Sequence, residues 1–188
     1  MTTRAFLTCA AACVAAAMGL ATPAACGAEA AAGAEGAAAD GLIASPEAGW
    51  PQWRGPRRDG VSLETGLLQA WPEGGPRLLW TASGLGRGWS SPIITGGRIY
   101  ITGEVGDDLR IFALDLEGKK VWDVANGAAW KDPHPGARAT CAYSDGRLYH
   151  MNAHGRVACL DAADGREVWA ADVLERFAGR QLTWALSE

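Results

Sequence analysis

The sequence lacks the clustered basic residues that a nucleic-acid-binding protein needs. It has 17 Lys and Arg against 21 Asp and Glu, for a formal net charge of −4 at pH 7, and no basic stripe stands out along it. Because a concentrated positive surface holds the phosphate backbone, nucleic acid is not an expected partner.

Histidine is also scarce, which limits the chemistry that the chain can support. The three histidines are His134, in a proline-rich connection, and His150 and His154, around a predicted hairpin. A zinc site needs three or four ligands, and the sequence places no third ligand near His150 and His154. We expect all three to be solvated loop residues. No serine stands in a nucleophile-elbow pattern, so a Ser-His-Asp triad is not predicted.

No hydrophobic run is long enough for a membrane-spanning helix. Arg4 precedes an apolar stretch over residues 5–20, which is shorter than the about 20 residues that a span requires. Small residues continue through Ala28 and Ala30. This order is typical of a secretory signal peptide, which we place at residues 1–28, with cleavage after Ala28 or Ala30.

Such a leader predicts export to the periplasm or cell envelope, with no transmembrane span after cleavage. A lipoprotein anchored through Cys26 ranks second, because residues 23–25 lack the leucine-like residue that a lipobox usually has. Residues 29–49 are rich in Ala and Gly and contain no aromatic side chain, which predicts a flexible tether.

Only two of the five cysteines, Cys141 and Cys159, lie beyond the leader. They fall on the first and third strands of one predicted four-stranded unit. Neighbouring strands are about 4.8 Å apart, so the pair is beyond disulfide reach, and two buried thiols outside any disulfide are expected.

An internal repeat is the most informative feature that the chain does contain. Residues 90–101 align with residues 139–150 at a constant separation of 49. After a three-residue insertion in the first copy, Trp122 aligns with Trp169. A period of this length in strand-rich sequence indicates propeller blades or a solenoid.

Each copy predicts four short antiparallel strands. Gly-Gly at residues 96–97 and Asp-Gly at residues 145–146 supply the positive φ angles of tight hairpins. The third strands, residues 110–114 and 156–160, run into turns that start with Asp and close with Gly. The fourth strand of each copy is expected to end on the repeated tryptophan.

Four such strands form a meander, which is one propeller blade, so the predicted fold class is an all-β propeller. A single blade cannot bury its faces, and stability must come from stacking blade on blade. We expect Trp122 and Trp169 to pack between blades, with an acceptor for the indole N–H on the neighbouring blade. Trp80 is interpreted as the same position of a preceding blade.

The turn after each third strand resembles the tryptophan-docking repeat of the quinoprotein, or PQQ-like, propellers, where PQQ is pyrroloquinoline quinone. The family pattern is Ala, any residue, Asp, a short turn, Gly-Lys and a terminal Trp. The first copy has a turn one residue short, and Arg166 replaces the Lys in the second. The resemblance assigns blade docking to Ala113, Asp115, Gly118 and Trp122 in the first copy and to Cys159, Asp161, Gly165 and Trp169 in the second.

The stretch over residues 50–62 resembles the start of secreted bacterial proteins with PQQ-like repeats. The resemblance covers about residues 50–188, which are too few for the four to eight blades of a closed ring. We therefore expect an incomplete propeller, the N-terminal piece of a longer protein. Its predicted parts are an opening segment at 50–82, blades at 89–122 and 138–169, and the start of a further blade at 184–188.

Four residues at the start of the inner strands are candidates for ligand binding at the propeller axis: Trp89, Ser90, Arg138 and Thr140. Packing is the competing interpretation for each. The Trp50–Gly55 segment has the Trp and Arg side chains of a binding edge, but packing of Trp53 and Arg54 against the closing blade is the favoured interpretation.

The resemblance leaves three functions open, because related blades serve different proteins. The first is a non-catalytic binding or scaffolding module that engages a protein or small molecule through loops or the central funnel. The alternative is a PQQ- and calcium-dependent alcohol or sugar dehydrogenase. Those enzymes have a vicinal Cys-Cys pair, whereas Ala142 follows Cys141 here, so the catalytic residues would lie in further blades. The third is an assembly factor, as in the Bam complex, that offers a sheet edge to partner strands.

Overall fold

The computed structural model describes residues 49–187, which belong to the second of two compact units, Asp40–Glu188. The predicted signal peptide at 1–28, the Cys26 alternative and the tether up to residue 48 lie outside the described residues. No helix in residues 49–187 is long and apolar enough to cross a membrane.

The first sheet is a four-stranded antiparallel meander. Its strands pair in chain order and are β1 (Ile93–Thr95), β2 (Arg98–Val105), β3 (Asp108–Leu114) and β4 (Lys120–Ala128). Gly96 and Gly97, with φ angles of 59° and 70°, join β1 to β2. Glycine adopts this left-handed backbone without a Cβ penalty, so the tight hairpin forms where the sequence predicts it.

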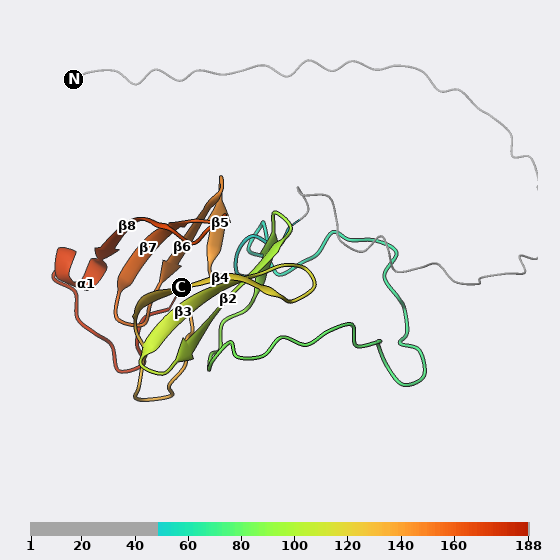
Figure 1. The fold of residues 1–188 in the computed structure, drawn as a ribbon, viewed down its shortest axis with the longest axis horizontal. Helices are drawn as coiled ribbons and strands as arrows, with labels where there is room; N and C mark the ends of the chain where they lie inside the picture. Colours follow the sequence, from blue (N-terminus) through green and yellow to red (C-terminus); the bar gives the residue numbers. More distant parts are fainter. Residues whose placement is uncertain (1–48, 188) are drawn as a thin grey trace, which may run out of the picture. The chain divides into compact units, whose positions relative to one another are not determined.

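The second sheet repeats this arrangement. Its strands also pair in chain order and are β5 (Ala142–Ser144), β6 (Arg147–Met151), β7 (Arg156–Asp161) and β8 (Glu167–Asp172). Figure 1 shows the two sheets side by side, with the short helix α1 (Val173–Arg176) after β8. Two antiparallel four-stranded sheets of this kind are two propeller blades, which confirms the predicted all-β fold class.

The fourth strands continue past their tryptophans, so the expectation that they end there is wrong. Trp122 is near the start of β4, and Trp169 is near the start of β8. The reason is the length of the neighbouring strand. Because β4 pairs along the whole of β3, from Leu114 back to Asp108, it must continue to Ala128.

The two sheets bury one shared apolar core. Cys141 and Cys159 are both buried, and neither forms a disulfide, as predicted. Trp122, Val124 and Tyr143 pack against this core from its margin. Its buried members are Ile93, Tyr100, Leu109, Ile111, Ala113, Ala137, Cys141, Leu148, Ala158, Leu160 and Ala162.

The opening segment is tied to both blades by its first residues. Trp50 exchanges backbone hydrogen bonds of 2.6 and 3.0 Å with Ile94, and the Pro51 carbonyl accepts the Tyr143 N–H at 2.8 Å. Trp53 is 48% exposed, with the Arg54 guanidinium 5.3 Å from its ring centroid. Packing of Trp53 and Arg54 on a closing blade stays a prediction.

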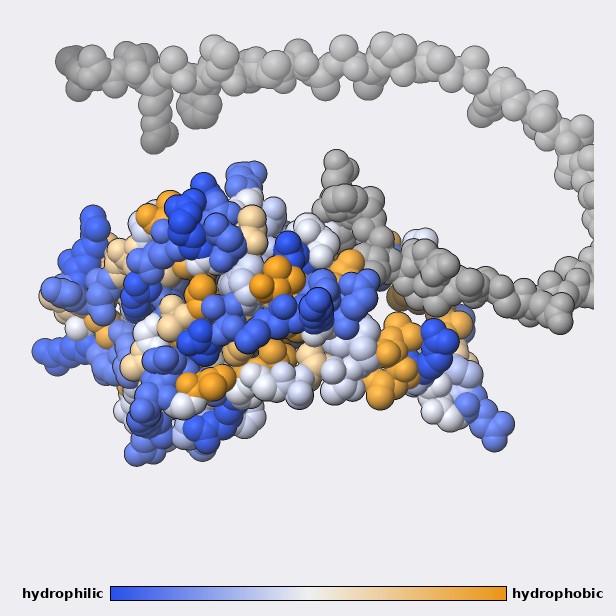
Figure 2. Space-filling model, viewed as in Figure 1, coloured by the Kyte–Doolittle hydropathy of each residue, from blue (hydrophilic) through white to orange (hydrophobic). Residues whose placement is uncertain are grey.

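Between this contact and the first blade, the chain runs through turns and bends and presents apolar side chains. Figure 2 shows apolar surface gathered over this segment, beyond the two sheets. The exposed members are Val61, Leu63, Leu67, Leu68, Trp71, Leu78 and Leu79.

Candidate functional site

One aromatic pair joins the first blade to the second. The rings of Tyr100 on β2 and Trp122 on β4 have centroids 5.9 Å apart. The Tyr100 hydroxyl and the Trp122 indole N–H both donate to the main-chain carbonyl of Ala162, at 3.1 and 3.3 Å. Burial raises the pKa of Tyr100 to about 12, so the hydroxyl is a neutral donor at physiological pH. The neighbouring blade therefore supplies the acceptor that the sequence predicts for the indole.

The Trp122 indole covers a turn that requires glycine. Gly165 has a φ of 76°, and a Cβ there would lie 2.8 Å from Trp122 Cε3. The same contact occurs one repeat earlier, because a Cβ at Gly118 would lie 2.4 Å from Trp80 Cε3. Two successive contacts of this kind support the interpretation of Trp80 as the docking residue of a preceding blade.

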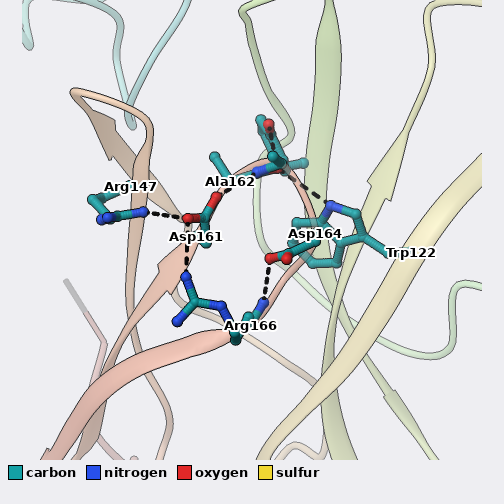
Figure 3. Close-up of polar contacts among 8 residues, drawn as sticks. Trp122, Arg147, Asp161, Ala162, Asp164 and Arg166 are labelled. Atoms are coloured by element: carbon teal, nitrogen blue, oxygen red, sulfur yellow. Dashed lines mark hydrogen bonds and ion pairs between the residues drawn. The ribbon is translucent and has the colours of Figure 1, made fainter.

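The turn that receives Trp122 is organised by an aspartate. Asp161 accepts the Ala163 N–H at 3.1 Å and the Arg147 guanidinium at 2.5 Å. Figure 3 shows Asp161 between the side chains of Arg147 and Arg166, with Trp122 approaching the same turn from the other sheet. The Ala163 N–H, and then Arg147, hold the pKa of Asp161 below its ordinary value.

The other predicted docking residues occupy equivalent places in the two blades. Ala113 lies opposite Trp122 in the β3–β4 register, and Cys159 lies opposite Trp169 in the β7–β8 register. Asp115 Oδ1 accepts two backbone N–H groups of its own turn, at 3.1 and 2.8 Å. These turns lie at one end of the sheets, which we call the docking end. The opposite end, formed by turns 106–107 and 152–155 and the connection 129–141, is the connection end.

The four axial candidates lie on the lead-in segments that run from the connection end into β1 and β5. The two segments form a parallel backbone bridge, and the Ser91 N–H donates to Thr140 Oγ1 at 3.1 Å. Ser90 Oγ donates to the Thr102 carbonyl, also at 3.1 Å. The structure thus brings the candidates together along the two lead-in segments. The hydroxyl groups of Ser90 and Thr140 form hydrogen bonds there with backbone groups of the same chain.

A repeated hydrogen bond links each lead-in segment to the connection of the next repeat. Trp89 Nε1 donates to the Pro135 carbonyl at 3.3 Å. Arg138, 49 residues after Trp89, donates through Nη1 to the carbonyl of Trp184, 49 residues after Pro135. We call this pair of bonds the clasp. The bond to Trp184 supports the prediction that a further lead-in starts at residues 184–188.

Arg138 also gathers aromatic side chains at the connection end. Its Nη2 donates to the His134 carbonyl, and its guanidinium carbon lies 5.9 Å from the Trp130 ring centroid. The His134 ring stacks on Trp184, with centroids 5.4 Å apart. Trp89 and Trp184 are 70% and 64% exposed, so this end presents tryptophan at the surface.

A buried polar network joins the blades beneath the clasp. Asn126 Nδ2 on β4 contacts His150 Nδ1 on β6 at 2.9 Å, and Asn152 Nδ2 donates to the Asn126 carbonyl at 2.8 Å. Arg156 Nη1 donates to Asn126 Oδ1 at 2.5 Å. Burial lowers the pKa of His150 to about 4. The expectation that all three histidines are solvated is therefore wrong for His150, which is 2% exposed because it points from β6 toward the first blade.

Glu104 is a buried acid that the sequence reasoning missed. It is 7% exposed, and its Oε1 accepts the Trp130 N–H at 2.7 Å, while Oε2 has no protein partner. Strand alternation places Glu104 on the same face of β2 as Thr102, whose Oγ1 donates to the Ala139 carbonyl at 3.1 Å. An acidic residue in phase with the buried positions of a predicted strand is the signal that could have revealed it.

The described part of the chain offers little for metal or quinone chemistry. Residues 49–187 contain no group of three or more His, Cys, Asp or Glu side chains that could hold a metal ion. The buried acid Glu104 is bonded to Trp130, and Ala142 stands where a vicinal cysteine would follow Cys141. Residues 49–187 therefore do not fit PQQ and calcium.

Antiparallel four-stranded blades joined by Trp–Gly docking define part of a β-propeller. Residues 107–183 match the family model PQQ_2, described as outer membrane protein assembly factor BamB. The chain therefore contains PQQ-like propeller repeats, as the docking motif predicts. A comparison with curated protein sequences finds no match.

Similar solved structures include two dehydrogenases and BamB. A quinohemoprotein alcohol dehydrogenase from Comamonas testosteroni is 21% identical, with a TM-score of 0.50, over 71% of this chain and 21% of that one. BamB from Moraxella catarrhalis is 23% identical, with a TM-score of 0.40, over 50% of this chain and 27% of that one. A europium-containing methanol dehydrogenase is 23% identical, with a TM-score of 0.39, over 51% of this chain and 18% of that one. The chain thus spans about a quarter or less of these proteins, and the likeness shows the fold alone.

Proposed function

We propose that the chain is part of an exported PQQ-like propeller that acts as a non-catalytic binding or scaffolding module in the periplasm or cell envelope. This proposal rests on the hydrogen-bond partners of the polar side chains among the axial candidates. Ser90, Thr140 and Arg138 bond to main-chain groups of neighbouring segments instead of converging on a common point. Side chains used in this way join neighbouring backbone segments, and they do not form a set of reacting groups.

The connection end supports a binding role. It presents the exposed rings of Trp89 and Trp184 beside Arg138, and Trp and Arg are enriched among the residues that anchor protein interfaces. The bond from Trp89 Nε1 to Pro135 restrains the indole before any ligand arrives. A restrained ring loses less conformational entropy on binding than a mobile one.

The competing function is a PQQ- and calcium-dependent alcohol or sugar dehydrogenase whose catalytic residues lie outside residues 49–187. The fold likeness to the Comamonas alcohol dehydrogenase keeps this alternative open. A shared fold is a weak warrant for shared chemistry, because function depends on the site.

A photo-reactive benzophenone amino acid in place of Trp89, in the full natural protein and in its own cells, tests the proposal. We expect one recurring protein or small-molecule adduct from this position. The control is the same amino acid in place of Arg166, whose side chain is 64% exposed at the docking end. The proposal fails if Trp89 gives no adduct above this control. It also fails if the purified protein, supplied with PQQ and calcium, shows quinone absorption and reduces a dye with an alcohol.

A further inference from the structure

An apolar pocket lies in the opening segment, beside the first residue that the structure describes. Its volume is about 500 Å³, and its apolar walls are Trp50, Pro56, Val61 and Leu63. Gly49 also lines it, so the chain enters the described part at the edge of the pocket. Val61 and Leu63 are 54% and 74% exposed. The pocket therefore offers apolar surface that further chain could cover.

The loop that forms one wall of the pocket is fixed by its own contacts. Asp59 accepts the Val61 N–H at 2.9 Å and Arg57 Nε at 2.8 Å. Gly55 has a φ of 79°, and a Cβ there would lie 2.7 Å from Trp50 Cζ3, so the loop packs directly on the indole. A wall built in this way needs little ordering when a side chain enters the pocket, which lowers the entropic cost of docking.

The chain that leads to this pocket contains one pair of large apolar residues. Within residues 29–48, Leu42 and Ile43 are the only apolar side chains larger than alanine or proline. The six steps of chain from Ile43 to Gly49 span about 20 Å when extended, so the pair can reach the whole pocket. Pro46, between the pair and Gly49, favours a turn by which the chain reverses its direction.

The charges of the two segments are complementary. Residues 54–58 of the opening loop carry three exposed arginines, Arg54, Arg57 and Arg58. Residues 29–48 contain no Lys or Arg, and their four acids are Glu29, Glu35, Asp40 and Glu47. Asp40 and Glu47 stand on either side of the apolar pair in the sequence. Exposed ion pairs contribute little energy, so apolar burial drives docking and the charges favour one orientation.

We propose that Leu42 and Ile43 dock into the pocket formed by Trp50, Pro56, Val61 and Leu63. A short linker gives this pair an effective concentration on the order of mM at the pocket, which favours it over a second copy of the chain or an apolar peptide of another protein. The tether predicted at residues 29–49 then shortens to about residues 29–41. The proposal is independent of whether the protein is a binding module or an enzyme.

A photo-reactive benzophenone amino acid in place of Leu63, in the full natural protein, identifies the occupant by mass spectrometry. We expect an adduct with a peptide that contains residues 40–48 of the same polypeptide. A mixture of isotopically labelled and unlabelled protein distinguishes this adduct from one with a second copy. The control is the same amino acid in place of Leu79, which is 68% exposed and does not line the pocket. An adduct with a second copy, with another protein or with any other segment, or no adduct above the control, overturns the proposal.

The double variant Leu42→Ser/Ile43→Ser tests the same contact while it leaves the pocket unchanged. Its matched control is Ala38→Ser/Ala39→Ser, which adds two serines to the same tether outside the apolar pair. Hydroxyl-radical footprinting should show Leu63 oxidised several-fold faster in the first variant than in the control. Trp122, which packs at the margin of the blade core, should keep its rate in both and so report intact blades. Equal oxidation of Leu63 in the two variants would overturn the proposal.

Discussion

At the residue scale, the Ala162 carbonyl is the point where the two blades are most directly joined. It accepts hydrogen bonds from Tyr100 and Trp122, which come from two different strands of the first blade. A carbonyl oxygen has two lone pairs, so both donors are satisfied at once. Removal of either donor leaves the carbonyl bonded to the other, so the lost hydrogen bond itself costs about its net value of 1 kcal/mol, and the rest of the cost comes from lost packing.

Replacement of Trp122 by alanine is expected to lower the free energy of unfolding by about 3 kcal/mol, because a large contact and a hydrogen bond are lost together. Urea denaturation followed by circular dichroism measures this change. The control is Trp71→Ala at a side chain that is 70% exposed, where the change should stay within about 0.5 kcal/mol. Equal losses in the two variants would show that Trp122 does not hold the blades together.

Gly165→Ala isolates the steric part of the same contact. Its matched control is Gly146→Ala, because Gly146 has a φ of 74°, close to the 76° of Gly165, but no atom within 4 Å of the position that an added methyl group would take. Both variants pay the left-handed backbone cost of about 1–2 kcal/mol. Gly165→Ala should lose at least about 1 kcal/mol more, because its methyl group meets Trp122. Equal thermal shifts for the two variants would contradict this contact.

His150 predicts a specific pH dependence of stability. Its pKa is about 4 in the folded protein and near 6.5 when unfolded, so the unfolded state binds more protons between these values. Stability from this group is complete above pH 6.5 and decreases as the pH falls toward 4, by at most about 1.4 kcal/mol per pH unit.

The free energy of unfolding, measured by urea titration at several pH values, should depend less steeply on pH for His150→Gln than for the unsubstituted protein between pH 4 and 6.5. His134→Gln, at an exposed position, should keep the slope of the unsubstituted protein. A His150→Gln slope that matches the unsubstituted protein would mean that another group carries the dependence.

At the scale of elements, the connection 129–141 is held by side chains in addition to the backbone bridge between Gly88 and Ala137. Trp89 binds its Pro135 carbonyl, Trp130 Nε1 donates to Pro133 at 2.9 Å, and Arg138 binds His134. The connection also places His134 against Trp184. Its conformation, and therefore the aromatic surface of the connection end, depends on these few bonds.

Trp89→Phe removes the indole N–H of the clasp while it keeps an aromatic ring. We expect a loss of about 1 kcal/mol in stability and faster amide hydrogen exchange in the connection 129–141. The control is Trp71→Phe, at an exposed position away from the clasp. Unchanged exchange in the connection would show that the bond from Trp89 does not restrain it.

At the scale of the whole described unit, the blade contact divides into two halves. The docking end is closed by the Trp122 contact at the margin of the apolar core. Near the connection end, the contact between the blades is built from Asn126, His150 and Asn152. Apolar area supplies most of the attraction between blades, and bonded polar groups favour one relative position.

The sequence predicted the features that recur as local motifs. Turn glycines, strand alternation and the repeated tryptophan led to the two blades and to the indole acceptor on the neighbouring blade. The strand lengths were missed because β4 continues to match β3, a pairing that no local signal reports. The clasp was missed because Trp89 and Arg138 are chemically different donors at equivalent positions. The burial of His150 depends on contact with Asn126 in another blade.

A double-mutant cycle between Trp122→Ala and Gly165→Ala tests most directly whether Trp–Gly docking joins the blades. If the methyl group that Gly165→Ala adds is destabilising because it meets the indole, removal of the indole relieves that cost. The account predicts that the double variant loses at least about 1 kcal/mol less than the sum of the single losses. Losses that add to within about 0.5 kcal/mol would contradict it, because the two residues would then be energetically independent.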